Sequence, residues 1–411
     1  MEQNTNILIP YMTPGVMLNF TITYSGCRAL RNLKLSMKNL YLNLAISCII
    51  FFGAVLLFSS YRATKRGSKI SFSSSTCQHL LRKRNPGLKI LLIDVDFLQK
   101  LTEANGTTCL WNERKPIKVG VEMEYKFNST HNLGDLGFEV FYYHNNASKD
   151  FLDLEMDAGR RLIPRKFKTR WVGNIEIPED TQRFEEFWKR SSFRDCVGLD
   201  MNRNKSDGVF LKGPETADIL AQLRDELLDN GMFPFLNSGT FLGWYRECTI
   251  IPHTYDVDFA VFKYNYKPEY PYKLLNGTSE FKLARMFGKL EDGLELTVVP
   301  KLKANPRIDV FVMYDGIENG VLTHHYTPGL GGDGTKYKFT YPIYDPWCAA
   351  ELHDHLFWVS CSPKPQIRHE YGPQWYLDHP TSQFGWNSSP KNIKENGKLT
   401  KEEMKKYYLE F

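Results

Sequence analysis

Two aspartates separated by one residue, Asp256 and Asp258, are the strongest chemical signal in the chain. They open an apolar run over 256–262 that predicts a strand, in which side chains two residues apart point to the same face. Both carboxylates would then reach one divalent cation, the usual arrangement for handling a phosphorylated substrate. Because the same pattern is common at the solvated ends of strands, it needs support from other residues.

A small turn upstream and a third aspartate downstream supply that support. The turn Ser238-Gly239-Thr240 contains a glycine, which would let backbone amides approach an anionic diphosphate without a clash from a Cβ atom. Asp309 lies in an apolar run over 307–313, where a carboxylate is costly to bury unless it is paired or bound to metal. The alternative for Asp309 is an arginine partner or backbone amides. We predict that Mg²⁺ or Mn²⁺ is held by three catalytic residues, Asp256, Asp258 and Asp309.

Other polar residues near these positions are weaker candidates. Arg246 is predicted to join Ser238, Gly239 and Thr240 in binding substrate phosphate; its alternative is a salt bridge with Glu247 or a core carboxylate. His253 could carry a proton, although a loop histidine is more often exposed. Glu295, on a predicted strand over 294–299, could lie on the metal-facing side.

A second Asp-x-Asp pair, Asp94-Val-Asp96, lacks a preceding Gly-Ser/Thr turn. It follows the buried strand predicted over 88–94 and precedes a helix that starts near Phe97. Acidic residues at such a junction are ordinary helix caps and surface groups. We therefore interpret this pair as structural.

Length and composition indicate two folded domains. The chain has 411 residues, of which 42% are hydrophobic, and its net charge of +5 is too small to indicate a nucleic-acid partner. Strands predicted over 137–143, 151–154 and 171–177 place an α/β stem domain at 86–205. The second domain, 206–411, begins with a helix predicted over 215–230 and contains the acidic residues, with a short helix over 241–247.

Residues 40–61 contain no charged side chain and are bounded by Lys38 and Arg62. A helix of that length spans the roughly 30 Å hydrocarbon core of a bilayer. The alternative, a cleaved signal peptide, is disfavoured by the long preceding segment and by the lack of a small-residue cleavage site. We predict a cytoplasmic tail over 1–39, a transmembrane signal anchor over 40–61 and a flexible stem over 62–85.

Glycosylation sequons decide the orientation, because basic residues are nearly balanced on the two sides of the span. One sequon asparagine, Asn19, precedes the span. The larger part of the chain is therefore predicted to be lumenal, with sequons at Asn105, Asn128, Asn146, Asn204, Asn276 and Asn387.

Six of the eight cysteines follow the predicted span, which permits up to three disulfides whose pairing cannot be deduced from the sequence. Cys348 and Cys361 bracket His353 and His355, but neither Cys-x2-Cys nor His-x3-His spacing is present. A disulfide or free thiols are favoured over zinc.

The order of helix, Gly-Thr turn, Asp-x-Asp and third aspartate resembles the polymerase-β type of nucleotidyltransferase fold. The run 238–262 is similar to fukutin-like members of the LicD-type phosphotransferase superfamily, and the resemblance covers about 206–411. Four further segments carry it: Phe287–Leu296, Ile308–Phe311, Tyr371–Trp375 and Trp386–Pro390.

The resemblance implies a Golgi type II membrane enzyme that transfers ribitol 5-phosphate from CDP-ribitol to a glycan, which within the family is a glycan on dystroglycan. It places Asp256, Asp258 and Asp309 at the metal positions and Gly239 and Thr240 at the phosphate-facing turn. Bacterial relatives transfer phosphocholine, so phosphocholine or glycerol phosphate is an alternative cargo. Golgi anchoring would favour assembly with other glycan-modifying transferases. A nucleotide-sugar glycosyltransferase and a catalytically silent glycan-binding or scaffold protein are the competing hypotheses.

Overall fold

The computed structural model of the protein describes residues 71–72, 89–103, 108–109, 115–126, 133–134, 137–172, 175–203, 208–303, 305–343 and 347–411. The chain divides into two compact units, Met1–Ser68 and Lys69–Phe411, and all described residues belong to the second. The predicted tail and membrane anchor lie outside the described residues. No helix within the described ranges is both long and apolar enough to cross a bilayer.

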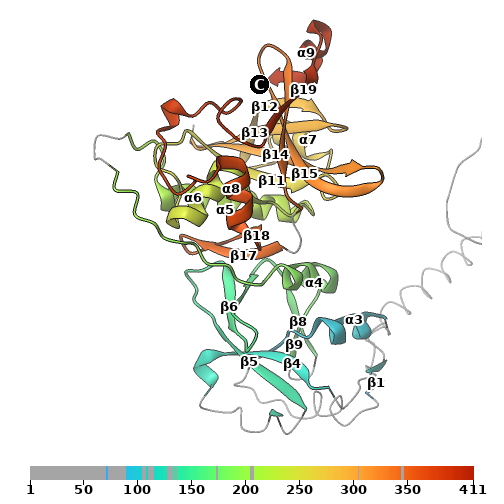
Figure 1. Ribbon diagram of the computed structural model, residues 1–411. Helices are drawn as coiled ribbons and strands as arrows, with labels where there is room; N and C mark the ends of the chain where they lie inside the picture. Colours follow the sequence, from blue (N-terminus) through green and yellow to red (C-terminus); the bar gives the residue numbers. More distant parts are fainter. Residues whose placement is uncertain are drawn as a thin grey trace, which may run out of the picture. The chain divides into compact units, whose positions relative to one another are not determined.

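The N-terminal part of the second unit is a seven-stranded mixed sheet in the order β7-β6-β5-β4-β2-β9-β8 (Figure 1). The interior strand β2 is buried along its whole length, because it has neighbours on both edges and its residues are all apolar. The strands are β2 Ile90–Leu92, β4 Ile117–Glu122, β5 Phe138–His144, β6 Phe151–Glu155, β7 Arg161–Pro164, β8 Thr169–Val172 and β9 Ile175–Pro178. Helices α3 Val95–Glu103 and α4 Thr181–Lys189, the 3-10 turn η1 Met123–Tyr125 and the short parallel pair β1 Ser71–Phe72 and β3 Thr108–Cys109 complete this part.

The mixed α/β prediction is confirmed, with one correction. The single strand expected over 171–177 is two antiparallel strands, β8 and β9. The structural interpretation of the Asp94–Asp96 pair is also confirmed. Asp94 accepts hydrogen bonds from the backbone amides of Phe97 (3.0 Å) and Lys118 (3.2 Å), and Asp96 forms a surface ion pair with Lys115.

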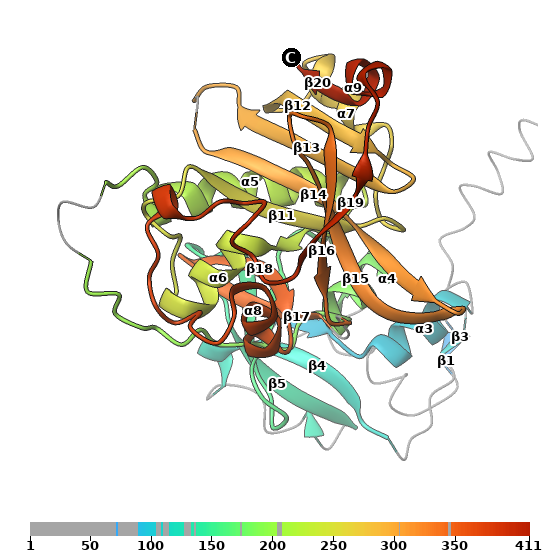
Figure 2. The same cartoon turned by 45° about the horizontal axis from the view of Figure 1, so that its top comes forward.

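The C-terminal part is built on a nine-stranded sheet with the path β19-β16-β15-β14-β13-β12-β20, to which β11 is added beside β14 and β10 beside β11 (Figure 2). Its strands are β10 Phe235–Leu236, β11 Asp256–Phe262, β12 Phe281–Lys289, β13 Gly293–Pro300, β14 Arg307–Glu318, β15 Val321–Leu330, β16 Thr335–Tyr341, β19 Ile393–Lys398 and β20 Tyr408–Glu410. The helical segments are α5 Gly213–Asp229, α6 Ser238–Glu247, α7 Tyr270–Leu275, α8 Pro363–Tyr371, η4 Thr381–Gln383 and α9 Lys401–Tyr407.

Helix α5 confirms the helix predicted over 215–230, and it is positioned by its apolar stripe. Leu220, Leu223 and Leu227 are fully buried and share one core with Val257 and Phe259 of β11. Because residues alternate along a strand, burial of 257 and 259 on this face directs 256 and 258 to the other face.

Helix α6 begins three residues earlier than predicted. The Ser238-Gly239-Thr240 segment, expected to be a turn ahead of a helix that starts at Phe241, forms the first helical turn instead. The first backbone N–H groups of a helix have no intrahelical acceptor, so this turn presents backbone donors and the positive end of the helix dipole, and the N–H of Thr240 bonds the Asp258 carboxylate. The correction makes the segment a better anion site than a loop would be.

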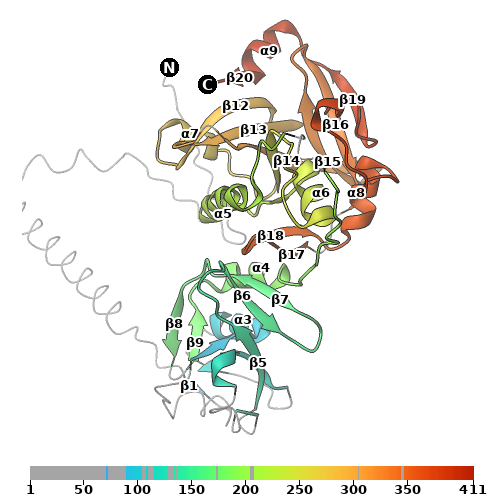
Figure 3. The same cartoon turned by 90° about the vertical axis from the view of Figure 1, so that its left-hand side faces the viewer.

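A two-stranded hairpin, β17 Trp347–Leu352 and β18 His355–Ser360, joins the two parts (Figure 3). Its backbone bonds the segment after α4, with Arg194 N donating to Ala349 O (2.8 Å) and Ala349 N to Ser192 O (2.9 Å). The ring of Trp358 stacks on Phe187 of α4.

Asp150 makes several of the polar contacts across this junction. Its carboxylate accepts from Arg224 Nη2 (2.9 Å), from the His355 ring Nδ1 (2.7 Å) and from Leu356 N (2.9 Å). The Arg224 side chain is only 1% exposed. Removal of Asp150 would therefore leave part of a buried charge without its partner.

We expect Asp150→Ala to lower the free energy of unfolding by about 3 kcal/mol, because breaking a buried ion pair is far more costly than losing an exposed one. Urea unfolding of the full-length protein measures this change. Lys405→Ala, which removes an exposed pair with Glu402, is the matched control and should cost less than about 0.5 kcal/mol. Equal losses in the two variants would contradict the prediction.

Candidate active site

Four polar side chains lie in register across four neighbouring strands of the C-terminal sheet. Asp258 of β11 pairs with Asp309 of the parallel strand β14, Asp309 with Thr297 of β13, and Thr297 with Arg285 of β12. We call these four residues the polar row. A register shift between Leu283 and Arg285 brings the arginine into line, as bulges do next to functional sites.

Contacts along the polar row connect its members. The Thr297 hydroxyl donates a short hydrogen bond to Asp309 Oδ1 and accepts one from Arg285 Nε (3.1 Å). Arg285 Nη2 also lies 3.5 Å from Asp309 Oδ1. The arginine partner considered as the alternative for Asp309 is therefore present, although it is 28% exposed and shared with the threonine.

The first turn of α6 contacts the aspartate end of the row. Thr240 Oγ1 accepts a hydrogen bond from the backbone N of Asp258 (2.7 Å), which ties the helix to the start of β11. A Cβ atom at Gly239 would lie 3.5 Å from Asp258 Oδ2, so any side chain there would cover the carboxylate. Ser238 has a positive φ of 41° and its Oγ lies 3.4 Å from the Tyr341 hydroxyl. The structure thus brings the predicted turn and Asp258 together.

Carboxylates outnumber cations around the row. Burial and repulsion from Asp256 raise the pKa of Asp309 to about 6, against the hydrogen bond from Thr297. Burial, together with Asp256 and Asp309, raises the pKa of Asp258, and burial with Asp309 raises that of Glu295. Such crowding favours a bound cation, because a hard divalent ion would offset the repulsion.

The donor set fits Mg²⁺ or Mn²⁺ in its chemistry, because it is made of carboxylate oxygens. Asp256 is exposed at the start of β11 and accepts a hydrogen bond from Thr254 (3.1 Å). Among the described residues, no three His, Cys, Asp or Glu side chains converge as a finished metal site. Glu295 lies two residues from Thr297 on β13 and so faces the same side as the row.

Glu370 and two tyrosines beside it were not singled out as site residues from the sequence. Glu370, near the end of α8, is 4% exposed. Burial raises its pKa to about 7, although hydrogen bonds with Tyr371, Ser238 and Tyr341 oppose the rise. The carboxylate also repels that of Asp258. A signal was available, because Tyr371–Trp375 is one of the segments that resemble the superfamily.

Arg246 lies at the other end of α6, eight residues and about 12 Å along the helix axis from Ser238. It is 2% exposed and donates to Glu247 (2.6 Å) and Asp378 (3.1 Å). Its predicted contact with phosphate is therefore wrong, and the salt-bridge alternative is the one observed. The helix geometry explains the error, since the five residues between Thr240 and Arg246 carry the arginine along the helix axis, away from the phosphate-facing turn.

His253 is buried rather than exposed. Its ring nitrogens contact Thr381 Oγ1 (2.8 Å) and the Asp378 carboxylate (3.2 Å). The pKa of Asp378 falls to about 2, because hydrogen bonds from Arg203 and His253 outweigh its burial. This network joins the loop before β11 to the segment after α8 and has no free donor for substrate among its described members.

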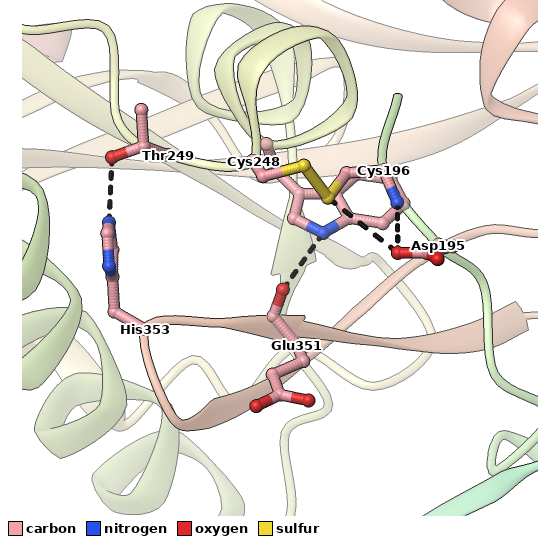
Figure 4. Close-up of a disulfide and its surroundings, with 7 residues drawn as sticks. Asp195, Cys196, Cys248, Thr249, Glu351 and His353 are labelled. Carbon is pink, nitrogen blue, oxygen red and sulfur yellow. Dashed lines mark hydrogen bonds between the residues drawn. A yellow bond between two sulfur atoms is a disulfide. The ribbon is translucent and has the colours of Figure 1, made fainter. Parts of the chain in front are cut away.

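Two disulfides are present in the described part of the chain, Cys196–Cys248 and Cys348–Cys361. Figure 4 shows the first, which links the segment after the N-terminal sheet to the end of α6, where Cys248 adopts a left-handed conformation. His353 lies nearby and bonds Thr249 Oγ1 (2.7 Å). The disulfide favoured over zinc for Cys348 and Cys361 is therefore confirmed.

The two disulfides close loops of different length, 52 and 13 residues. Chain entropy predicts losses of about 4 and about 3 kcal/mol when each is replaced by a serine pair. We expect Cys196→Ser with Cys248→Ser to be the more destabilising pair in urea unfolding of the full-length protein. A larger loss from the Cys348 and Cys361 pair would overturn this order.

A shallow, open pocket lies near the polar row, and Glu295 is one of the residues that line it. Phe287, Tyr337 and two paired lysines also line it. Lys289 bonds Glu403, and Lys336 bonds Asp292. The lining of this pocket is partly aromatic and partly charged, which suits one end of a small polar ligand.

Three predicted glycosylation sites, Asn146, Asn276 and Asn387, are exposed, as a modified asparagine must be. The Asn276 side chain accepts a hydrogen bond from the hydroxyl of Thr278 in its own sequon (2.8 Å). The other sites, Asn105, Asn128 and Asn204, lie outside the described residues.

Comparisons with known proteins cover both parts of the chain. Residues 76–195 match the family described as W02B3.4-like, N-terminal domain, and residues 231–361 match LicD/FKTN/FKRP, nucleotidyltransferase domain. The chain is 48% identical to the uncharacterized protein W02B3.4 of Caenorhabditis elegans, over 82% of this chain and 85% of that one. It is 40% identical to T07A5.1 of the same organism, over 81% and 87%.

Similarity to a characterised transferase is more limited in extent. The mouse ribitol-5-phosphate transferase FKTN is 32% identical over 54% of this chain and 47% of its own length. The chain thus spans about half of that relative. The match to the LicD/FKTN/FKRP domain includes α6, β11 and β14, and therefore the aspartate end of the polar row.

Proposed function

The chain belongs to one family with W02B3.4 and contains a LicD/FKTN/FKRP nucleotidyltransferase domain after its W02B3.4-like N-terminal domain, and we propose that it transfers a phospho-alditol to a glycan hydroxyl. The donor we propose is CDP-ribitol, and the acceptor is a glycan on a glycoprotein. The observation that carries the proposal is the register of Asp258 and Asp309 on neighbouring strands against the first turn of α6.

Mg²⁺ or Mn²⁺ would be held by Asp256, Asp258 and Asp309, with Glu295 as a further carboxylate on the same face. A bound divalent cation neutralises the diphosphate and the charge that develops as the nucleotide leaves. Burial is the main cause of the raised pKa values of Asp258 and Asp309, and repulsion between neighbouring carboxylates adds to it; a bound cation would relieve that repulsion, which supports this assignment.

The residues of the chain have separate roles in the proposed reaction. The backbone N–H of Gly239 would bind the diphosphate at the positive end of α6, and Thr240, whose own backbone N–H bonds the Asp258 carboxylate, would hold that turn against the acidic residues. The acceptor oxygen forms a bond to the β-phosphorus while the bond from that phosphorus to the CMP oxygen breaks, and CMP leaves. The acceptor proton passes to a carboxylate. Glu370 suits this task better than Asp309, because it does not also have to bind metal.

We further propose that residues 40–61 anchor the protein as a type II protein of the Golgi membrane with both domains in the lumen. Two disulfides and three exposed sequon asparagines support a lumenal position, since disulfides persist in oxidising compartments. Cleavage of Asn-linked glycans from the full-length protein, seen as a mobility shift after glycosidase treatment, tests it.

The function is tested with a panel of donors and the full-length protein in detergent. CDP-ribitol, CDP-glycerol, CDP-choline and UDP-sugars are incubated with Mg²⁺ or Mn²⁺, and nucleotide release is measured. Release of CMP from CDP-ribitol above the other donors supports the proposal. Release of CMP from another CDP-alcohol instead would identify a different transferred group and still support transfer from a CDP-activated donor. Glycan binding without nucleotide release from any donor would favour the silent scaffold.

A further inference from the structure

Two large, exposed aromatic rings lie against each other at an interplanar angle of 42°, next to the acidic residues along the chain. Phe210 is 53% exposed and Tyr255 is 54% exposed, and their ring centroids lie 4.4 Å apart. The backbone N of Phe210 donates to the carbonyl of Pro252 (2.8 Å), which fixes the segment before α5 to the loop that leads into β11. We call Phe210 and Tyr255 the aromatic pair.

The core does not explain the aromatic pair. Neither ring belongs to any of the hydrophobic clusters formed by the described residues. Exposed aromatic surface next to a polar site is typical of a binding surface, because the flat apolar face is covered when a ligand stacks on it.

The pair lies close to the polar row along the chain. Tyr255 directly precedes Asp256, so their Cα atoms are about 3.8 Å apart. Thr254, on its other side, bonds the Asp256 carboxylate (3.1 Å). The aromatic pair is therefore at the N-terminal end of β11, a few residues before Asp258.

The pocket lies on the other side of the polar row from the aromatic pair. Glu295 pairs with Phe311, and Phe311 pairs with Ala260, so the pocket wall is level with a residue two positions beyond Asp258. Along β11 the order is the aromatic pair, then the row, then the pocket. Two surfaces of different character thus flank the acidic residues.

In-line displacement places the attacking and leaving oxygens on opposite sides of the phosphorus. We propose that the aromatic pair binds a sugar ring of the acceptor glycan, whose apolar C–H face stacks on Phe210 and Tyr255. This inference rests on the proposed function. An open platform suits an acceptor that continues to a carrier protein, whereas the pocket side suits one end of a small soluble donor.

The test uses Phe210→Ala with Tyr255→Ala in the full-length protein. Phe210→Tyr and Tyr255→Phe are ring-preserving controls, and Tyr272→Ala removes an aromatic ring that is 72% exposed elsewhere. Initial rates are measured against acceptor concentration at saturating CDP-ribitol, and CMP release is measured without acceptor. Saturation-transfer NMR with chitotriose, mannotriose and galactobiose measures sugar binding independently of turnover.

We expect the double alanine variant to raise the acceptor KM about tenfold, the effect of losing stacking on two rings. The donor KM and acceptor-independent CMP release should stay unchanged, as should all values for the ring-preserving and Tyr272 variants. A rise in donor KM instead would assign the platform to the nucleobase and overturn the inference. An unchanged acceptor KM would overturn it as well.

The NMR arm separates this inference from the proposed function. If no CDP donor is turned over, loss of oligosaccharide signals in the double alanine variant alone still supports sugar binding by the aromatic pair. Signals that are absent from the unmodified protein, or equal in the variant, would overturn it.

Discussion

Asp258→Asn is expected to lower the transfer rate about a thousandfold while leaving the protein folded. The substitution removes a carboxylate that would hold the cation, and it keeps the shape of the side chain beside Gly239. The raised pKa of Asp258 means that the folded state disfavours its charged form. Without divalent metal, the neutral variant should therefore be as stable as the unmodified protein or more stable above the ordinary pKa of aspartate.

A second measurement detects the metal without turnover. Mg²⁺ or Mn²⁺ should raise the melting temperature of the unmodified protein, because a ligand that binds only the folded state stabilises it, and should not raise that of Asp258→Asn. Asp96→Asn is the matched control, since Asp96 belongs to the other Asp-x-Asp pair and bonds Lys115 at the surface. Unchanged turnover in Asp258→Asn would contradict the proposed site.

Glu370→Gln is expected to lower the transfer rate by about a hundredfold or more, the usual contribution of a general base. The amide keeps the size of the side chain but cannot accept the proton of the acceptor hydroxyl. Because burial raises the pKa of Glu370 to about 7, the rate of the unmodified protein should rise with pH up to that value. The variant should lose this rise. A pH-rate profile of the two proteins distinguishes a base from a residue that only supports packing.

The contribution of Glu370 to the free energy of unfolding should fall as pH rises, whereas the transfer rate should rise. A carboxyl group whose pKa is raised on folding stabilises the native state at low pH, and this contribution is lost as pH increases from the ordinary value to about 7. Relative to the unmodified protein, Glu370→Gln should therefore gain stability between these limits. Glu269→Gln, an exposed residue, is the control and should show neither effect. An unaltered pH-rate profile in Glu370→Gln would exclude it as the base.

The missed role of Glu370 shows where pattern reasoning fails. The residue lies more than 100 positions from Asp258 in the sequence, on a short helix with little apolar periodicity. Only the packing of α8 near α6 and β16 brings it beside Ser238 and Tyr341. No spacing rule connects residues that far apart. The segment that resembles the superfamily, Tyr371–Trp375, begins directly after Glu370 and does not include it.

The prediction that Arg246 contacts phosphate was wrong because it relied too much on closeness in sequence. Proximity in sequence to the Ser-Gly-Thr segment suggested a shared site, but the segment is helical, and a helix of ten residues separates its ends by more than a side chain can reach. The correction follows from the local conformation alone. The positions of Thr297 and Arg285 beside Asp309 could not be predicted from the sequence. Register between strands is set by the turns and bulges that join them.

The sequence by itself determined the alternation that directs Asp256 and Asp258 to one face of a strand, the burial of Asp309 among apolar neighbours, and the structural nature of Asp94 and Asp96. These are local properties of spacing and composition, so they do not depend on how the helices and strands pack together. Tertiary structure alone decided that Asp258 and Asp309 lie opposite each other, that Arg285 and Thr297 complete the row, and that Glu370 faces it. These are long-range contacts, and they depend on strand order and helix packing, which no short pattern specifies.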